Sequence, residues 1–524
     1  MIVCPQPAAA EAGLEVLRRG GNAIDAAVTT AFCQGVLDPQ MCGVGGSGMM
    51  LVHRAGARAG QATAECIEFH ARAGRGVRPD QWEKLLIRES ADRYGYVLEG
   101  AVNDVGYQSV GVPGTVAGLD LALRRHGTIA WPDALAPAIR IAREGFDVHG
   151  ALAGTWNREA GPDVVAMGER IQATAGAAAL YTRDGRPLPV GSRLVQADYA
   201  RTLETLARDG AASFYTGEIA DRIAADFAVN GGFISREDLA TYEPEVTQPL
   251  EGHYRGLRVA VPGPPAGGIS LLQMLNFLEG FEVSALQWPS IEAARLRVEA
   301  MRWAFTDREA HLADPRFADV PTGRLLAKEY ALSAAGRIHD SPTTTHISVI
   351  DAAGNAVAMT HTLGISSGVV TSGLGFSYNN YLNCFDPRPG RVNSLEPGKT
   401  RVTMMVPTIV FSEDGVRAIA GAPGGTKIVG AVLQVLLNLL DHGMTPVEAV
   451  SAPRIDFQAE FAEVEGRIPE AVVAGLRAGG IQVHRRPYNY DSYFAQVQLI
   501  SRSADGALRG ASDPRRDGGV ELSI

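Results

Sequence analysis

The stretch Pro342-Thr-Thr-Thr-His-Ile-Ser-Val-Ile-Asp-Ala-Ala-Gly-Asn-Ala-Val-Ala-Met-Thr-His-Thr362 carries much of the information about the fold of this chain. Apolar residues alternate with small or polar ones on both sides of the turn sequence at 351–355. This pattern predicts a hairpin of two half-buried strands, over 345–350 and 356–362. Three threonines, 343–345, stand where the first strand begins. Because threonine is common in strands, this pattern alone also allows these hydroxyls to be no more than the start of a strand.

Helical and strand-like patterns are mixed along the rest of the chain, and we find neither an internal repeat nor a linker that clearly separates domains. Helical spacing predicts two helices within 8–38, one from Gly111 to Arg125, and others over 131–145, 197–208, 217–229, 289–313 and 430–441, while strand-like segments lie at 256–261, 406–411 and 494–501. The segment 262–268, rich in glycine and proline, is expected to be a loop. This mixture predicts an antiparallel sheet core with helices packed on its faces.

The stretch Gly43-Val-Gly-Gly-Ser-Gly48 matches the glycine fingerprint of dinucleotide-binding folds. A dinucleotide site needs a strand before the glycines and a helix after them, so that the phosphate meets the N-terminus of the helix. Here the patterns predict a helix before the glycines and a strand, Met49 to His53, after them. We therefore interpret the stretch as a tight backbone turn against another loop.

The composition is that of a globular protein: of 524 residues, 46% are hydrophobic and 20% are charged, and the formal net charge is −10. The acidic balance gives no support for nucleic-acid binding, which requires a basic surface. The sequence has no run of 18 apolar residues, so no membrane span is expected. The chain as written shows no signal peptide, which favours a cytoplasmic protein. The five cysteines include no Cys-x-x-Cys pair and are expected to be reduced thiols.

The region around the threonine cluster resembles the start of the small subunit in the gamma-glutamyltranspeptidase family of N-terminal-nucleophile hydrolases. The resemblance rests on Thr344-Thr-His-Ile-Ser-Val349, on the Asp-x-x-Gly-Asn turn at 351–355 and on Thr362. It extends over nearly the whole chain, with similar motifs in the same order at 20–27, 43–46, 111–118, 254–256, 314–315 and 421–428. The joint order of these motifs is more specific than any one of them.

The resemblance implies an α+β fold, a four-layer αββα sandwich of antiparallel sheets covered by helices. It also implies an inert precursor that cuts its own peptide bond between Thr343 and Thr344. The products, a large subunit 1–343 and a small subunit 344–524, would stay together as one intertwined catalytic unit. The freed α-amine, with an unperturbed pKa of about 7.7–8.0, can accept the proton of the hydroxyl on the same residue, which an amide nitrogen cannot. Thr344 is the implied nucleophile, and Thr362 is implied to orient it.

The resemblance assigns the second half of the catalytic site to Gly424 and Gly425. Attack on an amide carbonyl places negative charge on oxygen, which requires preorganised hydrogen-bond donors. Two successive glycines let backbone N–H groups approach closely, because no Cβ stands in the way. The alternative is an ordinary loop after the strand at 406–411.

The family's recognition residues are replaced in this chain. The arginine that binds a substrate carboxylate aligns with His70, and the aspartate that binds the ammonium group aligns with Cys384. A histidine does not reproduce an arginine fork, and a thiol lacks the charge that an ammonium group needs. Arg72 is close enough in sequence to bind a carboxylate instead. The residues expected to bind substrate are His70, Arg72, Tyr381, Asn383, Cys384, Thr403 and Met404, and Gly364 replaces a family asparagine.

These replacements predict a self-processing amide hydrolase or acylase with weak or absent gamma-glutamyl transfer, acting on a small-molecule amide without a cofactor. By resemblance, related enzymes hydrolyse cephalosporin side chains or small amides such as oxamate, and a few act on carbon–carbon bonds. One alternative is a glutathione hydrolase or gamma-glutamyltransferase in which other residues bind the carboxylate and the ammonium group of the substrate. Two others are a cysteine hydrolase built on Cys384 and an uncleaved, non-catalytic scaffold. The sequence does not decide whether the protein forms homo-oligomers.

The positions of His311, His346 and His361 indicate structural roles, so no metal site is expected.

Overall fold

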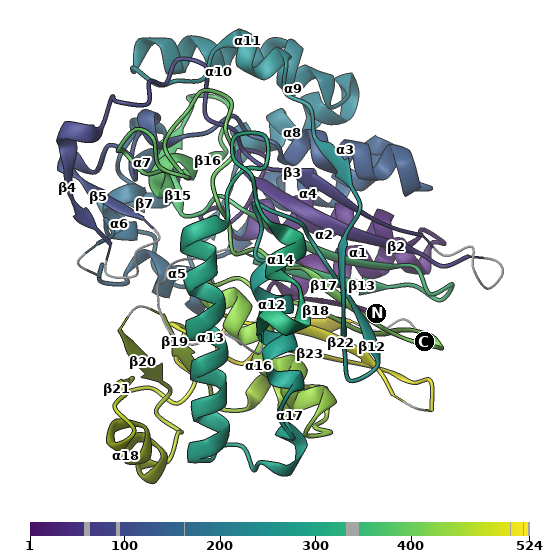
Figure 1. The fold of residues 1–524 in the computed structure, drawn as a ribbon. Helices are drawn as coiled ribbons and strands as arrows, with labels where there is room; N and C mark the ends of the chain where they lie inside the picture. Colours follow the sequence, from purple (N-terminus) through teal and green to yellow (C-terminus); the bar gives the residue numbers. More distant parts are fainter. Residues whose placement is uncertain are drawn as a thin grey trace.

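Two antiparallel sheets lie in the middle of the computed structural model, with helices on both sides of the pair (Figure 1). The structure describes residues 1–56, 63–90, 95–161, 163–331, 345–458, 460–503, 505–516 and 518–521. The predicted nucleophile Thr344 and its neighbour Thr343 lie outside the described residues.

The first sheet has seven strands within the described residues, and all of its neighbouring pairs are antiparallel. Its order is β10 (Glu245–Thr247), β3 (Thr63–Phe69), β2 (Ser47–Arg54), β14 (Ala356–Thr362), β13 (Thr345–Ile350), β1 (Ile2–Cys4) and β24 (Gly519–Glu521). The predicted hairpin is confirmed with its predicted bounds, and Ile347 lies opposite Met359. The hairpin is buried throughout, not half-buried, because the second sheet covers the face that carries His346 and Ser348.

The second sheet is also antiparallel, and six strands form it in the part of the chain that the structure describes. Its order is β11 (Leu250–Tyr254), β12 (Leu257–Val261), β17 (Thr408–Ser412), β18 (Gly415–Gly421), β22 (Gln498–Arg502) and β23 (Leu508–Ser512). A layer of apolar side chains joins the two sheets, including Leu51 on β2, Ala358 on β14 and Ile419 on β18.

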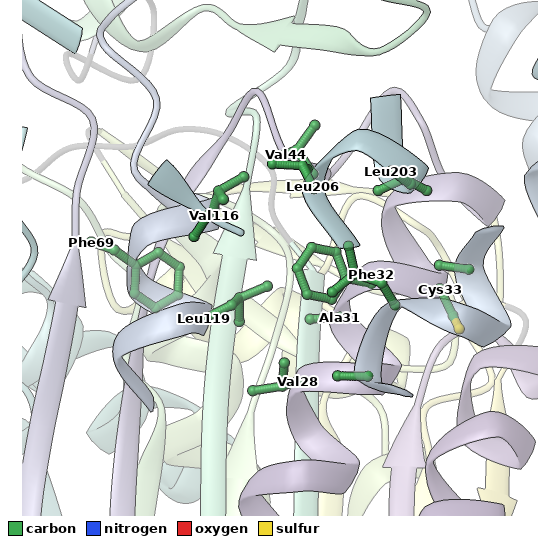
Figure 2. Close-up of a cluster of buried hydrophobic side chains, with 14 of the residues drawn as sticks. Val28, Ala31, Phe32, Cys33, Val44, Phe69, Val116, Leu119, Leu203 and Leu206 are labelled. Atoms are coloured by element: carbon green, nitrogen blue, oxygen red, sulfur yellow. The ribbon is translucent and has the colours of Figure 1, made fainter. Parts of the chain in front are cut away.

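Each sheet buries its other face under helices. The seven-stranded sheet packs on α1 (Pro7–Arg18), α2 (Ala23–Leu37) and α3 (Thr115–His126), while α4 (Trp131–Glu144) packs on α2 and α8 (Ala197–Asp209) packs on α4. Figure 2 shows part of this core, including Phe32 of α2, Leu119 of α3 and Leu203 of α8. The six-stranded sheet packs on α12 (Gly268–Glu279), α16 (Lys427–Leu440) and α17 (Pro446–Ser451), and α13 (Ile291–His311) packs on α12. The order helices, sheet, sheet, helices confirms the expected four-layer αββα sandwich.

The chain before and after the predicted cleavage position shares both sheets. In the first sheet, β13 and β14 lie between β2 and β1, and in the second, β17 lies beside β12. Cutting the chain between these segments would leave the strand pairs in place. The two halves therefore form one unit rather than two domains.

Shorter elements complete the fold. They are α5 (Gly150–Trp156), α6 (Met167–Arg170), α7 (Ala175–Tyr181), α9 (Ala212–Thr216), α10 (Glu218–Val229), α11 (Arg236–Ala240), α14 (Thr322–Leu325), α15 (Lys328–Ala331), α18 (Glu470–Ala478), β4 (Leu86–Glu89), β5 (Tyr96–Leu98), β6 (Phe146–Asp147), β7 (Thr182–Arg183), β8 (Arg186–Pro187), β9 (Arg193–Leu194), β15 (Ser366–Val370), β16 (Ser377–Asn379), β19 (Ile455–Phe457), β20 (Phe461–Val464) and β21 (Gln482–Arg485). Among the described residues no helix has the length and apolar character of a membrane span. All five cysteines are buried, and none of them is in a disulfide.

His346 lies between the two sheets as a neutral side chain. Its Nδ1 is 2.8 Å from Oγ1 of Thr360, and its Nε2 is 3.2 Å from Oγ of Ser348. Complete burial, reinforced by the neighbouring His361, lowers the pKa of His346 to about 3. The folded protein therefore resists protonation of this ring, whereas the unfolded chain accepts the proton near its ordinary value of about 6.5.

We predict that His346→Gln makes the stability of the protein less sensitive to acid. Because the pKa of His346 is lower in the folded than in the unfolded state, its contribution is complete above pH 6.5 and is lost as pH falls toward 3. The loss amounts to about 1.4 kcal/mol per pH unit in that window. Chemical denaturation at pH 7 and pH 4.5 measures it. His253→Gln, on the exposed side of β11, is the matched control, and equal slopes for His346→Gln and the unmodified chain would refute this account.

Candidate active site

The described part of the site begins at Thr345, the residue that follows the predicted nucleophile Thr344. Thr345 is the first residue of β13, and Thr362 is the last residue of the neighbouring strand β14. Thr362 is 2% exposed, and its Oγ1 accepts a hydrogen bond of 2.7 Å from the N–H of Gly364. The hydroxyl that we expect to orient the nucleophile is therefore itself held in place at the end of its strand.

A chain of buried side-chain hydrogen bonds lies behind the start of β13. Gln34 on α2 donates through Nε2 to Oγ1 of Thr345 at 3.5 Å and to Oε1 of Gln6 at 2.6 Å. Its Oε1 accepts from Nε2 of His361 at 2.8 Å, and Gln6 donates to Oδ2 of Asp38 at 2.8 Å. Burial lowers the pKa of His361 to about 3, so this ring is neutral. These bonds tie the first residue of the hairpin to the helix layer.

The glycines at 43–48 form a backbone turn that packs on the end of β14. A Cβ added to Gly46 would lie 2.5 Å from the carbonyl oxygen of Thr362, and one added to Gly45 would lie 2.4 Å from that of Ser377. Helix α2 precedes the turn and strand β2 follows it. The glycines serve close backbone packing, which confirms the interpretation of this stretch as a turn against another loop.

Strand β18, which leads into the predicted glycine loop, packs across the hairpin. A Cβ added to Gly421, the last residue of β18, would lie 2.2 Å from Cε1 of His346. The loop that follows contains Gly424 at φ +140° and Gly425 at φ +62°, both in the left-handed region that favours glycine. In the described part of the chain, neither N–H of these two glycines donates a hydrogen bond to another protein group. Two adjacent backbone donors are therefore open beside the start of helix α16.

A buried ion pair stands behind this loop. A Cβ added to Gly424 would lie 2.3 Å from Cβ of Ala495, so the segment around Ala495 forms the wall of the loop. Arg454 donates to the carbonyl oxygen of Ala495 and pairs with Asp513, and Asp513 also accepts from the N–H of Val497 at 3.1 Å. Burial lowers the pKa of Arg454 to about 10, where it is still charged at neutral pH. The structure buries Asp513 behind the glycine loop.

Four of the residues expected to bind substrate come together. Tyr381, Asn383 and Cys384 lie on one short 3₁₀ helix, Tyr381–Cys384, and the thiol of Cys384 donates to Oδ1 of Asn383 at 3.1 Å. The hydroxyl of Tyr381 lies 3.4 Å from Nδ1 of His70, whose Nε2 is 3.3 Å from a carboxylate oxygen of Glu68. His70, Tyr381 and Cys384 are all buried. The positions of the aligned arginine and aspartate thus belong to one buried cluster.

The other three expected residues have different surroundings. The guanidinium of Arg72 donates to Glu245 at 2.7 Å and to the carbonyl oxygen of Glu243 at 3.0 Å, which commits it to strand β10. Thr403 accepts from the N–H of Met405 at 3.4 Å. Met404 belongs to the apolar core of the six-stranded sheet, because its side chain lies under the helices on that face. The expected role of Met404 in binding substrate stays a prediction.

Sequence reasoning missed Arg401, which lies among the expected substrate-binding residues. Its side chain is 5% exposed, and Nη1 donates to Oδ1 of Asn383 and to Sγ of Cys384. Its guanidinium carbon lies 4.5 Å from the centre of the Tyr381 ring. A Cβ added to Gly364 would lie 3.4 Å from Nη2 of Arg401. The one available signal in the sequence was a charged residue immediately before an apolar run, two positions from the expected Thr403.

The three histidines singled out from the sequence lie on two strands and at the end of a helix. His346 and His361 lie on the paired strands, and His311 ends α13 with Nε2 2.9 Å from a guanidinium nitrogen of Arg324. No group of three or more His, Cys, Asp or Glu side chains suited to a metal ion occurs among the residues that the structure describes.

Comparisons with known proteins find similar sequences and structures over nearly the whole chain. The family model described as gamma-glutamyltranspeptidase matches residues 9–523. The acylase ACY 1 proenzyme of Pseudomonas sp. (strain SE83) is 36% identical, covering 99% of this chain and 92% of the relative. The glutathione hydrolase proenzyme of Escherichia coli (strain K12) is 34% identical, covering 98% and 90%. The crystal structure of cephalosporin acylase from Bacillus halodurans superimposes with a TM-score of 0.88 at 30% identity, covering 99% of this chain and 95% of that chain.

A match over nearly the whole chain, together with the hairpin, the glycine loop and the four layers, identifies the fold and the type of enzyme. The chain belongs to the gamma-glutamyltranspeptidase family, and it is an N-terminal-nucleophile hydrolase of the amidase, acylase or gamma-glutamyltransferase-like type.

Proposed function

We propose that the chain is a self-processing amide hydrolase or acylase with Thr344 as its nucleophile and with an acyl pocket that no longer recognises gamma-glutamyl groups. Cleavage before Thr344 frees the α-amine that serves as its base. The interleaved strands support this proposal, because the fragments 1–343 and 344–524 would remain in shared sheets. The names of two relatives, both called proenzymes, agree with processing.

In the proposed reaction, Oγ1 of Thr344 attacks the carbonyl carbon of the amide while the α-amine takes the hydroxyl proton. A carbon–oxygen bond forms, and the N–H groups of Gly424 and Gly425 bind the resulting oxyanion. Collapse of this intermediate breaks the carbon–nitrogen bond, and the departing amine takes the proton. Water then attacks the acyl ester, with the same α-amine as base, and restores Thr344. The open donors in the described glycine loop support this role.

The cysteine at position 384 carries the substrate proposal. A gamma-glutamyl substrate presents both a carboxylate and an ammonium group. Cys384 stands where the family aspartate would bind the ammonium group, and it donates its thiol proton to Asn383. An ammonium group desolvated beside a thiol lacks the opposite charge that offsets its burial. We therefore assign the enzyme to amides whose acyl group lacks that ammonium group.

The second candidate function is a glutathione hydrolase in which other residues bind the carboxylate and the ammonium group of the substrate. One observation favours it. Arg401 brings a guanidinium to the pocket from a segment other than the one that aligns with the family arginine. That residue can bind a carboxylate, but a glutathione hydrolase also needs a partner for the ammonium group. The substrate panel below separates the two functions.

We predict that the purified chain runs as two fragments on a denaturing gel, with Thr344 as the first residue of the smaller one. Thr344→Ala should remain a single full-length band, because no hydroxyl is available at residue 344 to attack the preceding peptide bond. Thr344→Ser is the matched control and should still be cut. An uncut preparation that turned over amides at full rate would refute self-processing, and an uncut, inactive one would support the scaffold alternative.

We predict that Gly424→Ala lowers kcat by about 10²–10³, the usual cost of one lost oxyanion donor. The added Cβ collides with Ala495 and forces the loop to move. Gly443→Ala is the control, since Gly443 also has a positive φ, +62°, but has open space around its Cβ position. Single-turnover rates and thermal unfolding should be measured for both variants. If both lose the same rate, the loop at 424–425 has no special role.

We predict that the processed enzyme hydrolyses an anilide with a simple acyl group faster than gamma-glutamyl anilide or glutathione. The expected ratio of kcat/KM values is at least about tenfold, because the ammonium group of the gamma-glutamyl substrate would be poorly compensated. Release of the chromogenic aniline measures the anilides, and release of glutamate measures glutathione. A preference for glutathione would instead establish the second candidate function, glutathione hydrolysis. Cys384→Ser should retain hydrolysis, whereas its loss would favour a cysteine hydrolase.

A further inference from the structure

Arg158, which follows helix α5, is an arginine to which the proposed reaction gives no role. Its Nη2 donates to Oγ of Ser492 at 3.2 Å, and this is its one hydrogen bond to the part of the chain that the structure describes. The side chain reaches solvent. A guanidinium carries five N–H donors, so most of those of Arg158 can still bind another acceptor.

Ser492 belongs to the segment that forms the wall of the glycine loop. Its carbonyl oxygen accepts from Nε2 of Gln496 at 3.1 Å, and the N–H of Gln496 donates at 3.1 Å to the carbonyl oxygen of Pro423, just before the two open donors. Ala495, three residues after Ser492, packs against the same loop. Three residues span at most about 11 Å when extended. The bond to Ser492 therefore holds Arg158 on the side of the site that carries the oxyanion donors.

A second guanidinium, that of Arg516, approaches Arg158 from the side of the nucleophile. Arg516 pairs with Asp38 at the end of α2, and Asp38 belongs to the buried hydrogen-bond chain that ends at Thr345. Helix α5 packs on the same turn, because its apolar residues share a core cluster with Met41. The surroundings of Arg158 thus belong to both halves of the catalytic site, the start of β13 and the glycine loop.

The carboxylates in this region already have cationic partners. Asp38 pairs with Arg516. Asp491 pairs with Arg486, at 3.3 Å from its Nε. The protein around Arg158, and then the charge of Arg516, lower the pKa of Arg158, and Asp491 offsets only part of this. Because a guanidinium stays charged at neutral pH, a bound anion would relieve the repulsion between the two arginines.

The residues expected to bind the acyl half of the substrate lie on other elements. His70 follows β3, and Tyr381 and Cys384 lie on the 3₁₀ helix. Arg158 instead follows α5 and bonds to the segment before β22. The acyl and amine halves of a planar trans amide extend away from each other on either side of the C–N bond. We therefore assign the side of the site at Arg158 to the amine half.

We propose that Arg158 binds an anionic group on the amine half of the substrate, so that the enzyme prefers amides whose leaving amine carries a carboxylate. Arg516 supplies a second positive charge to the same place. The inference rests on the proposed amidase function and names the class of amine that the enzyme releases. Arg158 contacts the substrate and determines specificity, and it takes no part in bond breaking.

The test compares two substrates of the same shape, the N-pentanoyl amides of 3-aminobenzoate and of 3-aminobenzamide. The unmodified enzyme should show a kcat/KM about tenfold higher for the carboxylate, as expected for a charge-assisted hydrogen bond. In Arg158→Gln this ratio should fall to about one, through a higher KM for the carboxylate, and Arg158→Lys should keep part of it. Added salt should also reduce the ratio in the unmodified enzyme, because charges that reach solvent are screened.

Arg124→Gln is the matched control. It removes the same charge from an exposed arginine near the opposite end of α2, where Asn22 donates to the carbonyl oxygen of His126 at 2.7 Å. This variant should leave the ratio unchanged. Chromatography of the released amines measures all the rates.

Two outcomes would overturn the inference. One is an unmodified enzyme that does not distinguish the two amides, and the other is a ratio that survives in Arg158→Gln. If Arg158→Gln does not fold or process, the exposed Ser492 offers a second test. Ser492→Asp should pair with the guanidinium and reduce the ratio, whereas the neutral Ser492→Asn should preserve it, and equal ratios in these two variants would also contradict the inference.

A binding measurement separates this inference from the proposed function. Calorimetric titration of the full chain should show about tenfold tighter binding of 3-aminobenzoate than of 3-aminobenzamide, and Arg158→Gln should abolish the difference. If no amide is hydrolysed but this difference holds, the amidase proposal fails and the anion site stands. If amides are hydrolysed and the difference is absent, the anion site fails and the amidase proposal stands.

Discussion

The close approach of the two sheets at Gly421 and His346 is the constraint on which the active site depends. Only a residue without a side chain allows β18 to pass at this distance from the imidazole ring. His346 follows two residues after the predicted nucleophile, and Gly421 precedes the first open donor, that of Gly424, by three residues. One packing contact thus joins a hairpin and a glycine loop that are distant in the sequence. The ring must remain neutral, because a charged imidazolium between two buried sheets would be poorly solvated.

Buried ion pairs fix the other side of the glycine loop. Arg454 and Asp513 hold the segment at Ala495, and Arg515 links Asp513 to Glu465 with both partners almost fully buried. Such pairs seldom add much net stability, because desolvation offsets their attraction. Removing one partner, however, leaves a buried charge uncompensated and costs several kcal/mol. Their effect here is to define one geometry for the wall behind Gly424, which an oxyanion site requires.

The sequence predicted local elements well wherever their pattern was regular. The hairpin 345–350 and 356–362 and the helices within 8–38 formed as predicted, since alternation and helical spacing were clear there. Strand β3 was missed because glutamates interrupt its apolar residues, and β18 because it is rich in glycine and alanine. Helix α12 was missed because it directly follows a glycine and proline loop. The strand expected at 494–501 begins only at Gln498, since the preceding segment bonds to Pro423 and Asp513 instead.

By itself the sequence predicted an antiparallel sheet core covered by helices, because regular local patterns show such elements, and its family resemblance implied the four layers. It also supplied the threonine and glycine motifs, because these follow from residue identity. Only the tertiary structure decided which side chains share the pocket. It gathered His70, Tyr381 and Cys384, placed Met404 in the core and committed Arg72 to Glu245. It also brought Arg401 to the pocket. Such neighbours come from different parts of the chain, and their meeting depends on how two sheets pack, which no local pattern encodes.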